Sequence, residues 1–133
     1  MRWLLAALLL AAFPANAAAP LAGTWFGSGQ PWDRSAMYID TMAPDGSFHA
    51  HHRFCSKGKA SDQYERGRWS LKGDHLTIVI TQVDGWGGAR TDEYRVLSHD
   101  AHQQRYVYLP KNFTYTSKRV PDDFPMPACD LVS

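Results

Sequence analysis

The sequence predicts an all-β protein that folds as an eight-stranded antiparallel up-and-down (meander) barrel. After residue 17, no apolar repeat at three- and four-residue spacing is long enough to indicate a helix. Short alternating or β-rich segments recur instead, and residues typical of turns separate them. Because the connections are short, successive strands are expected to be antiparallel neighbours, and closure into a barrel removes the exposed edges.

Residues 1–17 have the features of a secretory signal. Arg2 precedes an apolar run over residues 4–13, and the small residues Ala15 and Ala17 flank Asn16 as in a cleavage site. The run is too short to span a bilayer. We therefore expect cleavage after Ala17 and a soluble protein in the periplasm or outside the cell.

The eight expected strands follow one another without a long crossover. They span about residues 23–28, 36–42, 47–55, 63–71, 75–83, 91–98, 105–109 and 113–120. Residues 121–133 contain three prolines, which cannot pair within a central strand. The chain is therefore divided into a signal peptide (1–17), a barrel (18–120) and a C-terminal arm (121–133) on the outside of the barrel.

The turn after the second strand sets the register of the first hairpin. Pro, Asp and Gly at positions 44–46 suit a type I turn followed by a left-handed glycine. This turn pairs Asp40 with Ala50 and Tyr38 with His52. Alternation along the strands then directs these side chains into the barrel.

Two later turns predict more of the interior. A Gly-Asp turn pairs Leu71 with Leu76, and a Pro-Lys-Asn turn at 110–112 pairs Val107 with Tyr115. Both pairs are expected to face inward. The expected apolar wall consists of Phe48, Phe54, Leu76, Ile78, Val107 and Tyr115.

Cys55 and Cys129 are the two cysteines of the chain. In a small exported domain, such a pair is expected to form a disulfide. The chain-entropy estimate for a loop of this length is roughly 4 kcal/mol of stabilisation. A reactive thiol or metal-ligand pair is the alternative, but no Cys-x-x-Cys spacing supports it.

Composition excludes some partners. The chain carries 14 Lys and Arg residues against 13 Asp and Glu, and loss of Arg2 with the signal makes these counts equal. This balance argues against a nucleic-acid partner and against stable insertion into a membrane.

The longer, glycine-rich loops are expected at one end of the barrel, the mouth, and they contain Trp32 and Trp86. A tryptophan beside glycine has little local structure to bury it and can offer a flat apolar face to a ligand. The alternative is that each ring folds over the mouth as a plug.

Below the mouth, the expected interior contains Tyr38, Asp40, His52 and Phe54. A polar cluster in an apolar barrel is suited to orient the polar end of a ligand. The alternative is an internal hydrogen-bond network. If Asp40 and His52 are buried together, their titrations are coupled and the pKa of His52 is raised, which would also suit acid–base chemistry.

No common catalytic or metal-binding motif is present. His49 and His51 share the outer face of a strand, but no third ligand follows at a fixed spacing. The sequence contains neither Gly-x-Ser-x-Gly, nor His-Glu-x-x-His, nor a phosphate-binding glycine loop. We therefore assign no catalytic residue, no metal and no cofactor.

The order of the short motifs resembles a known family. Gly23-Thr24-Trp25 is similar to the Gly-x-Trp motif that opens lipocalins. The Pro-Asp-Gly-Ser-Phe segment at 44–48, with Gly-Arg-Trp at 67–69, resembles the repeating pattern of small bacterial lipocalin-like (calycin-type) exported domains. Lys118-Arg119-Val120 lies where such chains end the last strand with an arginine.

This resemblance implies roles for four residues. In the family, the arginine stacks on the first-strand tryptophan and closes the barrel floor, which assigns a structural role to Trp25 and Arg119. A disulfide often ties the C-terminal arm to the barrel, as Cys55 and Cys129 would do. The chain is shorter than full-length lipocalins and has no recognisable helix after the barrel.

We therefore expect an exported protein that holds a small, mostly apolar or amphipathic molecule at the wide end of the barrel. Two alternatives remain open. One is a filled barrel that binds a protein or glycan through Trp32 and Trp86. The other is a small periplasmic enzyme that uses Asp40 and His52, although a binding protein is favoured over an enzyme.

Overall fold

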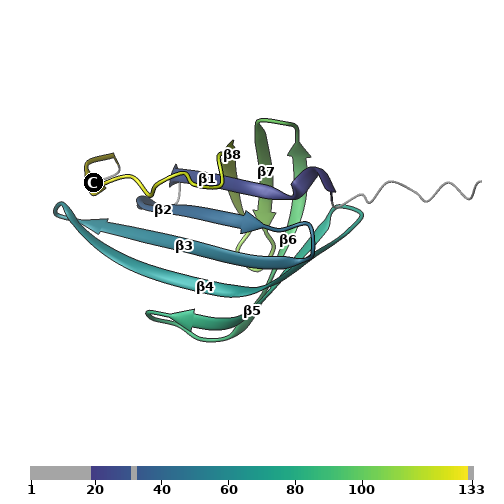
Figure 1. The fold of residues 1–133 in the computed structure, drawn as a ribbon, viewed down its shortest axis with the longest axis horizontal. Helices are drawn as coiled ribbons and strands as arrows, with labels where there is room; N and C mark the ends of the chain where they lie inside the picture. The colour runs from purple at the N-terminus through teal and green to yellow at the C-terminus, as the bar shows by residue number, and fades with distance from the viewer. Residues whose placement is uncertain (1–18, 31–32, 132–133) are drawn as a thin grey trace, which may run out of the picture.

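The computed structural model describes residues 19–30 and 33–131 and confirms the predicted barrel (Figure 1). Neither the predicted signal peptide (1–17) nor Trp32 lies within the described residues. Among the residues described, no helix is both long enough and apolar enough to cross a membrane.

Eight antiparallel strands close into one barrel in sequential order, and β1 completes it by pairing with β8. The strands are β1 (Gly23–Gln30), β2 (Asp33–Met42), β3 (Ser47–Ser56), β4 (Lys59–Lys72), β5 (His75–Asp84), β6 (Arg90–His99), β7 (Gln103–Tyr108) and β8 (Phe113–Val120). Two short 3-10 segments, η1 (Ala19–Leu21) and η2 (Cys129–Leu131), flank them.

The register of the β2–β3 hairpin is confirmed. Asp40 pairs with Ala50, and Tyr38 pairs with His52. Gly46 adopts the positive φ of 90° that the turn requires. This register places Asp40 on the inner face of the barrel, where it lines a cavity.

The prediction for the β7–β8 hairpin is wrong by one residue. Val107 pairs with Thr114 rather than with Tyr115, which instead pairs with Tyr106. The turn takes up one residue more than expected, because the Leu109 amide donates to the Glu93 carbonyl of β6. A slip of one residue exchanges the faces of a strand, so Val107 leaves the expected apolar wall and tyrosines take its place.

The floor of the barrel is filled by apolar side chains. Trp25 is fully buried and donates its indole N–H to the Leu21 carbonyl over 3.0 Å. The Arg119 guanidinium lies 4.3 Å from the Trp25 ring centroid and donates to the Ala22 carbonyl over 2.8 Å. The other buried residues of this apolar core, which continues upward from the floor, are Met42, Phe48, Ala50, Trp69, Leu76, Ile78 and Ile80. These side chains leave a small cavity of about 40 Å³ beside Asp40, and the larger interior spaces lie nearer the mouth.

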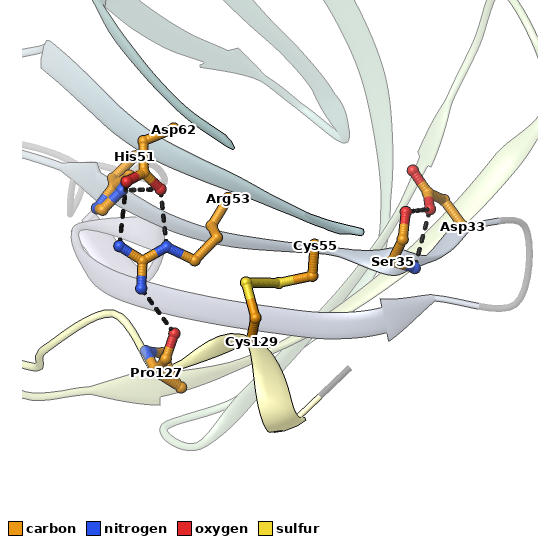
Figure 2. Close-up of a disulfide and its surroundings, with 8 residues drawn as sticks. All are labelled: Asp33, Ser35, His51, Arg53, Cys55, Asp62, Pro127 and Cys129. Carbon is orange, nitrogen blue, oxygen red and sulfur yellow. Dashed lines mark hydrogen bonds and ion pairs between the residues drawn. A yellow bond between two sulfur atoms is a disulfide. The ribbon is translucent and has the colours of Figure 1, made fainter. Parts of the chain in front are cut away.

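The C-terminal arm crosses the outside of the barrel and is fixed at several points. The predicted Cys55–Cys129 disulfide is present (Figure 2). Arg53 donates to the Pro127 carbonyl over 2.9 Å and forms an ion pair with Asp62 of β4, as Figure 2 also shows. The arm therefore covers an outer apolar cluster that includes Phe26 and Met37.

Candidate functional site

The inward positions of the barrel change from apolar to polar above the floor. Asp40 lies two residues before the floor residue Met42 on β2, and Asp92 pairs with Ile78 across β5 and β6. Because alternate residues of a strand face the same side, both carboxyl groups are directed into the barrel. Charged groups in such a position need partners.

Four polar side chains inside the barrel form a chain of ion pairs, in the order His52, Glu65, Arg90 and Asp92. His52 Nε2 lies 2.8 Å from Glu65 Oε1, and Arg90 Nη1 lies 2.6 Å from Glu65 Oε2. The latter contact is an ion pair without aligned hydrogen-bond geometry. Arg90 Nε donates to Asp92 Oδ2 over 2.9 Å. Glu65, with a side chain only 2% exposed, therefore carries two cationic partners.

These contacts favour the charged forms of Glu65 and His52. Burial alone would raise the pKa of Glu65, but its hydrogen bond to His52 and its contact with Arg90 lower that pKa to about 2. Burial alone would lower the pKa of His52. The hydrogen bond to Glu65 and the charge of Asp40 outweigh this effect, so the pKa lies above its ordinary value. Both shifts favour the ionised forms, so the contact between Glu65 and His52 stabilises a carboxylate and an imidazolium.

Asp40 differs from its neighbours because it lacks a partner. Its Oδ1 is buried and makes no hydrogen bond with any residue that the structure describes. Burial raises the pKa of Asp40 to about 7, since the attraction of His52 is opposed by the charges of Glu65 and Asp92. Burial also raises the pKa of Asp92, despite the contact with Arg90. Asp40 thus changes its charge near neutral pH.

Aromatic rings form most of the remaining wall. The tyrosines that line this part of the barrel are Tyr38, Tyr94, Tyr106, Tyr108 and Tyr115. The Tyr106 hydroxyl donates to the Tyr38 hydroxyl over 2.9 Å, and the rings of Tyr106 and Tyr115 stack with their centroids 5.4 Å apart. Burial raises the pKa of Tyr38 and of Tyr106, so both phenols are neutral across the physiological range.

Gly27 on β1 makes room for one of these rings. A Cβ at this position would overlap the ring of Tyr38. The absence of a side chain here therefore lets the Tyr38 ring pack directly against β1. A glycine inside a strand often marks such a close approach.

The tyrosines line an open cavity of about 180 Å³ together with Asp40, His52, Arg90 and Asp92. A second cavity of about 320 Å³ lies toward the mouth. Tyr38, His52, Arg90 and Tyr115 line both cavities. The two spaces therefore adjoin, and together they lead from the mouth to Asp40.

Trp86 and Phe54 form the apolar side of the mouth. Their ring centroids are 5.2 Å apart in an edge-to-face arrangement. Trp86 is 45% exposed although it lines the 320 Å³ cavity. It therefore stands at the entrance of the barrel and does not plug it.

Five of the six ligand-binding candidates from the sequence line these cavities, namely Tyr38, Asp40, His52, Phe54 and Trp86. The sixth, Trp32, lies outside the described residues.

The sequence did not predict the partner of His52. Glu65 holds this imidazole, whereas Asp40 acts on it only through its charge. Glu65 escaped notice because the β3–β4 connection was expected to be a longer loop, and Arg90 because it was expected in the loop before the sixth strand, whereas it is the first residue of β6. The structure instead has a tight turn in which Ser56 pairs with Lys59. The ladder that continues from this turn pairs Ala50 with Glu65.

The outer-face histidines take separate positions. His51 Nε2 lies 3.2 Å from Asp62 Oδ1, and its ring stacks on Tyr64 with centroids 4.4 Å apart. His49 is exposed. The His51 contact is therefore part of the surface that holds the C-terminal arm.

No protein-family model matches the chain, and no curated protein is significantly similar to it. The function must therefore be argued from the chemistry of the cavities.

Proposed function

We propose that the protein is an exported binding protein that holds a small amphipathic molecule in the upper half of the barrel. The observation that carries this proposal is the unfilled interior above the floor, which reaches a buried carboxylate oxygen without a hydrogen-bond partner among the described residues. An unpaired buried polar atom costs roughly 1–3 kcal/mol. A ligand that satisfies this oxygen would remove that cost.

The lining of the cavities indicates what such a ligand needs. Phe54 and Trp86 at the mouth provide apolar surface, and the interior beyond them offers hydroxyl and ionised groups. This gradient suits a molecule with an apolar end toward the mouth and a polar end toward Asp40. A filled-barrel interaction module fits less well, because its interior would have no space to receive a molecule.

Two further observations support export and a place among binding barrels. The Cys55–Cys129 disulfide is compatible with an oxidising compartment. The stacking of Arg119 on Trp25 matches the role that the resemblance to lipocalin-like domains implies for these residues.

The test is a titration with N-phenyl-1-naphthylamine, a neutral dye whose fluorescence rises in apolar surroundings. We expect saturable binding at one site. Ala36 lines the mouth cavity, and Ala36→Phe should weaken binding by at least about tenfold by filling it. Trp86→Ala should also weaken binding, because the dye loses an aromatic contact.

The matched control is Leu97→Ala. Leu97 is 48% exposed, close to the 45% of Trp86, but it lines neither cavity. Its replacement should leave the affinity unchanged. An affinity that responds equally to all three substitutions would place the dye on the outer surface and contradict the proposal.

A further inference from the structure

We propose that the molecule bound in this cavity is a small organic cation whose ammonium group lies between the tyrosine rings and the Asp40 carboxylate. This inference rests on the proposed function and specifies the chemical class of its ligand. Three features carry it: the balance of charges in the cavity, the aromatic character of its wall and the lack of a partner for Asp40.

The charge balance leaves one carboxylate in excess. Asp40, Glu65 and Asp92 face two cationic side chains, His52 and Arg90. Both cations are already engaged, His52 by Glu65 and Arg90 by Glu65 and Asp92. Among the described residues, no cationic side chain contacts Asp40. With every group ionised, the cluster therefore has the charge that one monovalent cation neutralises.

The aromatic wall favours an organic cation with an apolar surface over a hydrated metal ion. Aromatic faces attract ammonium groups through their quadrupoles, and the attraction strengthens where water is excluded. Tyr94 lies edge-to-face with Tyr106 at 5.3 Å and with Tyr115 at 6.4 Å, so the rings surround the space from different directions. A cavity of about 180 Å³ suits a compact group such as a substituted ammonium.

An anionic ligand fits this cavity poorly. It would have to lie beside Asp40 and Asp92, and it would have to compete with Glu65 for His52 and Arg90. Arg90 is 40% exposed at the rim, and its Nε and Nη1 already contact carboxylates. The deepest free charge in the cavity is therefore negative.

Binding of a cation should compete with a proton at Asp40. The pKa of this carboxyl is about 7 in the empty cavity, so ionising it for the ligand becomes progressively costlier below neutral pH. The groups that face Asp40 from the packed strands are Tyr38, His52, Glu65, Arg90, Asp92, Tyr94, Tyr106 and Tyr115. The pKa of Glu65 is about 2, so this group stays ionised across the range of the experiment. The pKa of Asp92 is raised, as that of Asp40 is, so Asp92 also becomes protonated more readily as the pH falls.

The experiment compares choline with 3,3-dimethylbutan-1-ol, in which a carbon replaces the charged nitrogen and the shape is kept. Binding of each to the mature protein is measured by calorimetry at about pH 8 and about pH 5.5. We expect choline to bind at least about tenfold more tightly than the alcohol at the higher pH. This preference should shrink at the lower pH, where Asp40 is protonated.

Two variants assign the preference to one carboxylate. Asp40→Asn should remove the preference for choline and leave binding of the alcohol in place. The control is Asp74→Asn, which removes a side chain that is 68% exposed in the β4–β5 turn and should change neither affinity. If Asp40→Asn does not fold, the comparison of the two probes and its pH dependence in the unaltered protein still decide the matter.

Equal affinities, a preference for the alcohol, or tighter binding of 3,3-dimethylbutanoate would each overturn the cation proposal. If the neutral naphthylamine dye still binds in the cavity, the proposed function survives that result. If the dye fails to bind as well, both proposals are wrong.

Discussion

Replacing Asp40 by asparagine is expected to stabilise the empty protein above neutral pH. The carboxyl has an ordinary pKa of 3.8 and a pKa of about 7 in the folded barrel. Each tenfold change in proton affinity corresponds to about 1.4 kcal/mol. Folding with an ionised Asp40 therefore costs about 4 kcal/mol above pH 7.

The sign follows from the raised pKa. Between about pH 4 and pH 7 the folded protein binds a proton at Asp40 that the unfolded chain has lost, so this group favours folding more as the pH falls. By about pH 4.5 the cost has fallen to about 1 kcal/mol. The stabilisation from Asp40→Asn is smaller than the cost of the ionised carboxylate, because the asparagine amide also needs hydrogen bonds in the cavity.

Urea unfolding of the two proteins at about pH 8 and about pH 4.5 measures this effect. The free-energy gain from Asp40→Asn should be about 3 kcal/mol larger at the higher pH. The hydrogen bond between His52 and Glu65 is common to both proteins, whereas the part of the His52 pKa shift that comes from Asp40 is lost with the carboxylate. Asp74→Asn gives the baseline for an exposed carboxyl. A gain that does not depend on pH, or a loss at pH 8, would refute the reasoning.

Three further changes test other contacts. Glu65→Gln should destabilise the fold by about 3 kcal/mol, because the buried side chain loses the charge that pairs with His52 and Arg90; urea unfolding at neutral pH checks this, and an unchanged midpoint would contradict it. Gly27→Ala should displace the ring of Tyr38 and cost about 1–3 kcal/mol, with a change in near-ultraviolet circular dichroism that a freely accommodated methyl group would not produce. Joint replacement of Cys55 and Cys129 by serine should lower stability by about 2–4 kcal/mol and expose the arm to limited proteolysis, whereas an equally resistant arm would show that the other contacts suffice.

The parts of the fold set by local turn chemistry could be predicted from the sequence. The Pro-Asp-Gly segment before β3 has one favourable geometry, and it fixes the inward positions of Asp40 and His52 through a single short hairpin. The disulfide followed from the presence of two cysteines in a chain with export features.

The rest depended on contacts that short-range patterns do not encode. Lys57 adopts a positive φ of 53° in the tight β3–β4 turn, a conformation uncommon for a residue other than glycine or asparagine. Without that turn, the pairing of Ala50 with Glu65 could not be derived. The inward face of β7 likewise depended on one hydrogen bond from Leu109 to β6, because Val107 on one face of that strand and Tyr106 on the other are both suited to a barrel interior.

The central claim is that a small molecule enters the upper half of the barrel. The most direct measurement is a map of chemical-shift changes in the ¹⁵N- and aromatic ¹³C-labelled protein as N-phenyl-1-naphthylamine is added. We predict changes concentrated at Tyr38, Phe54, Trp86 and Tyr115, which line the cavities. Changes confined to exposed outer positions such as Leu97, or no saturable change at all, would contradict the claim.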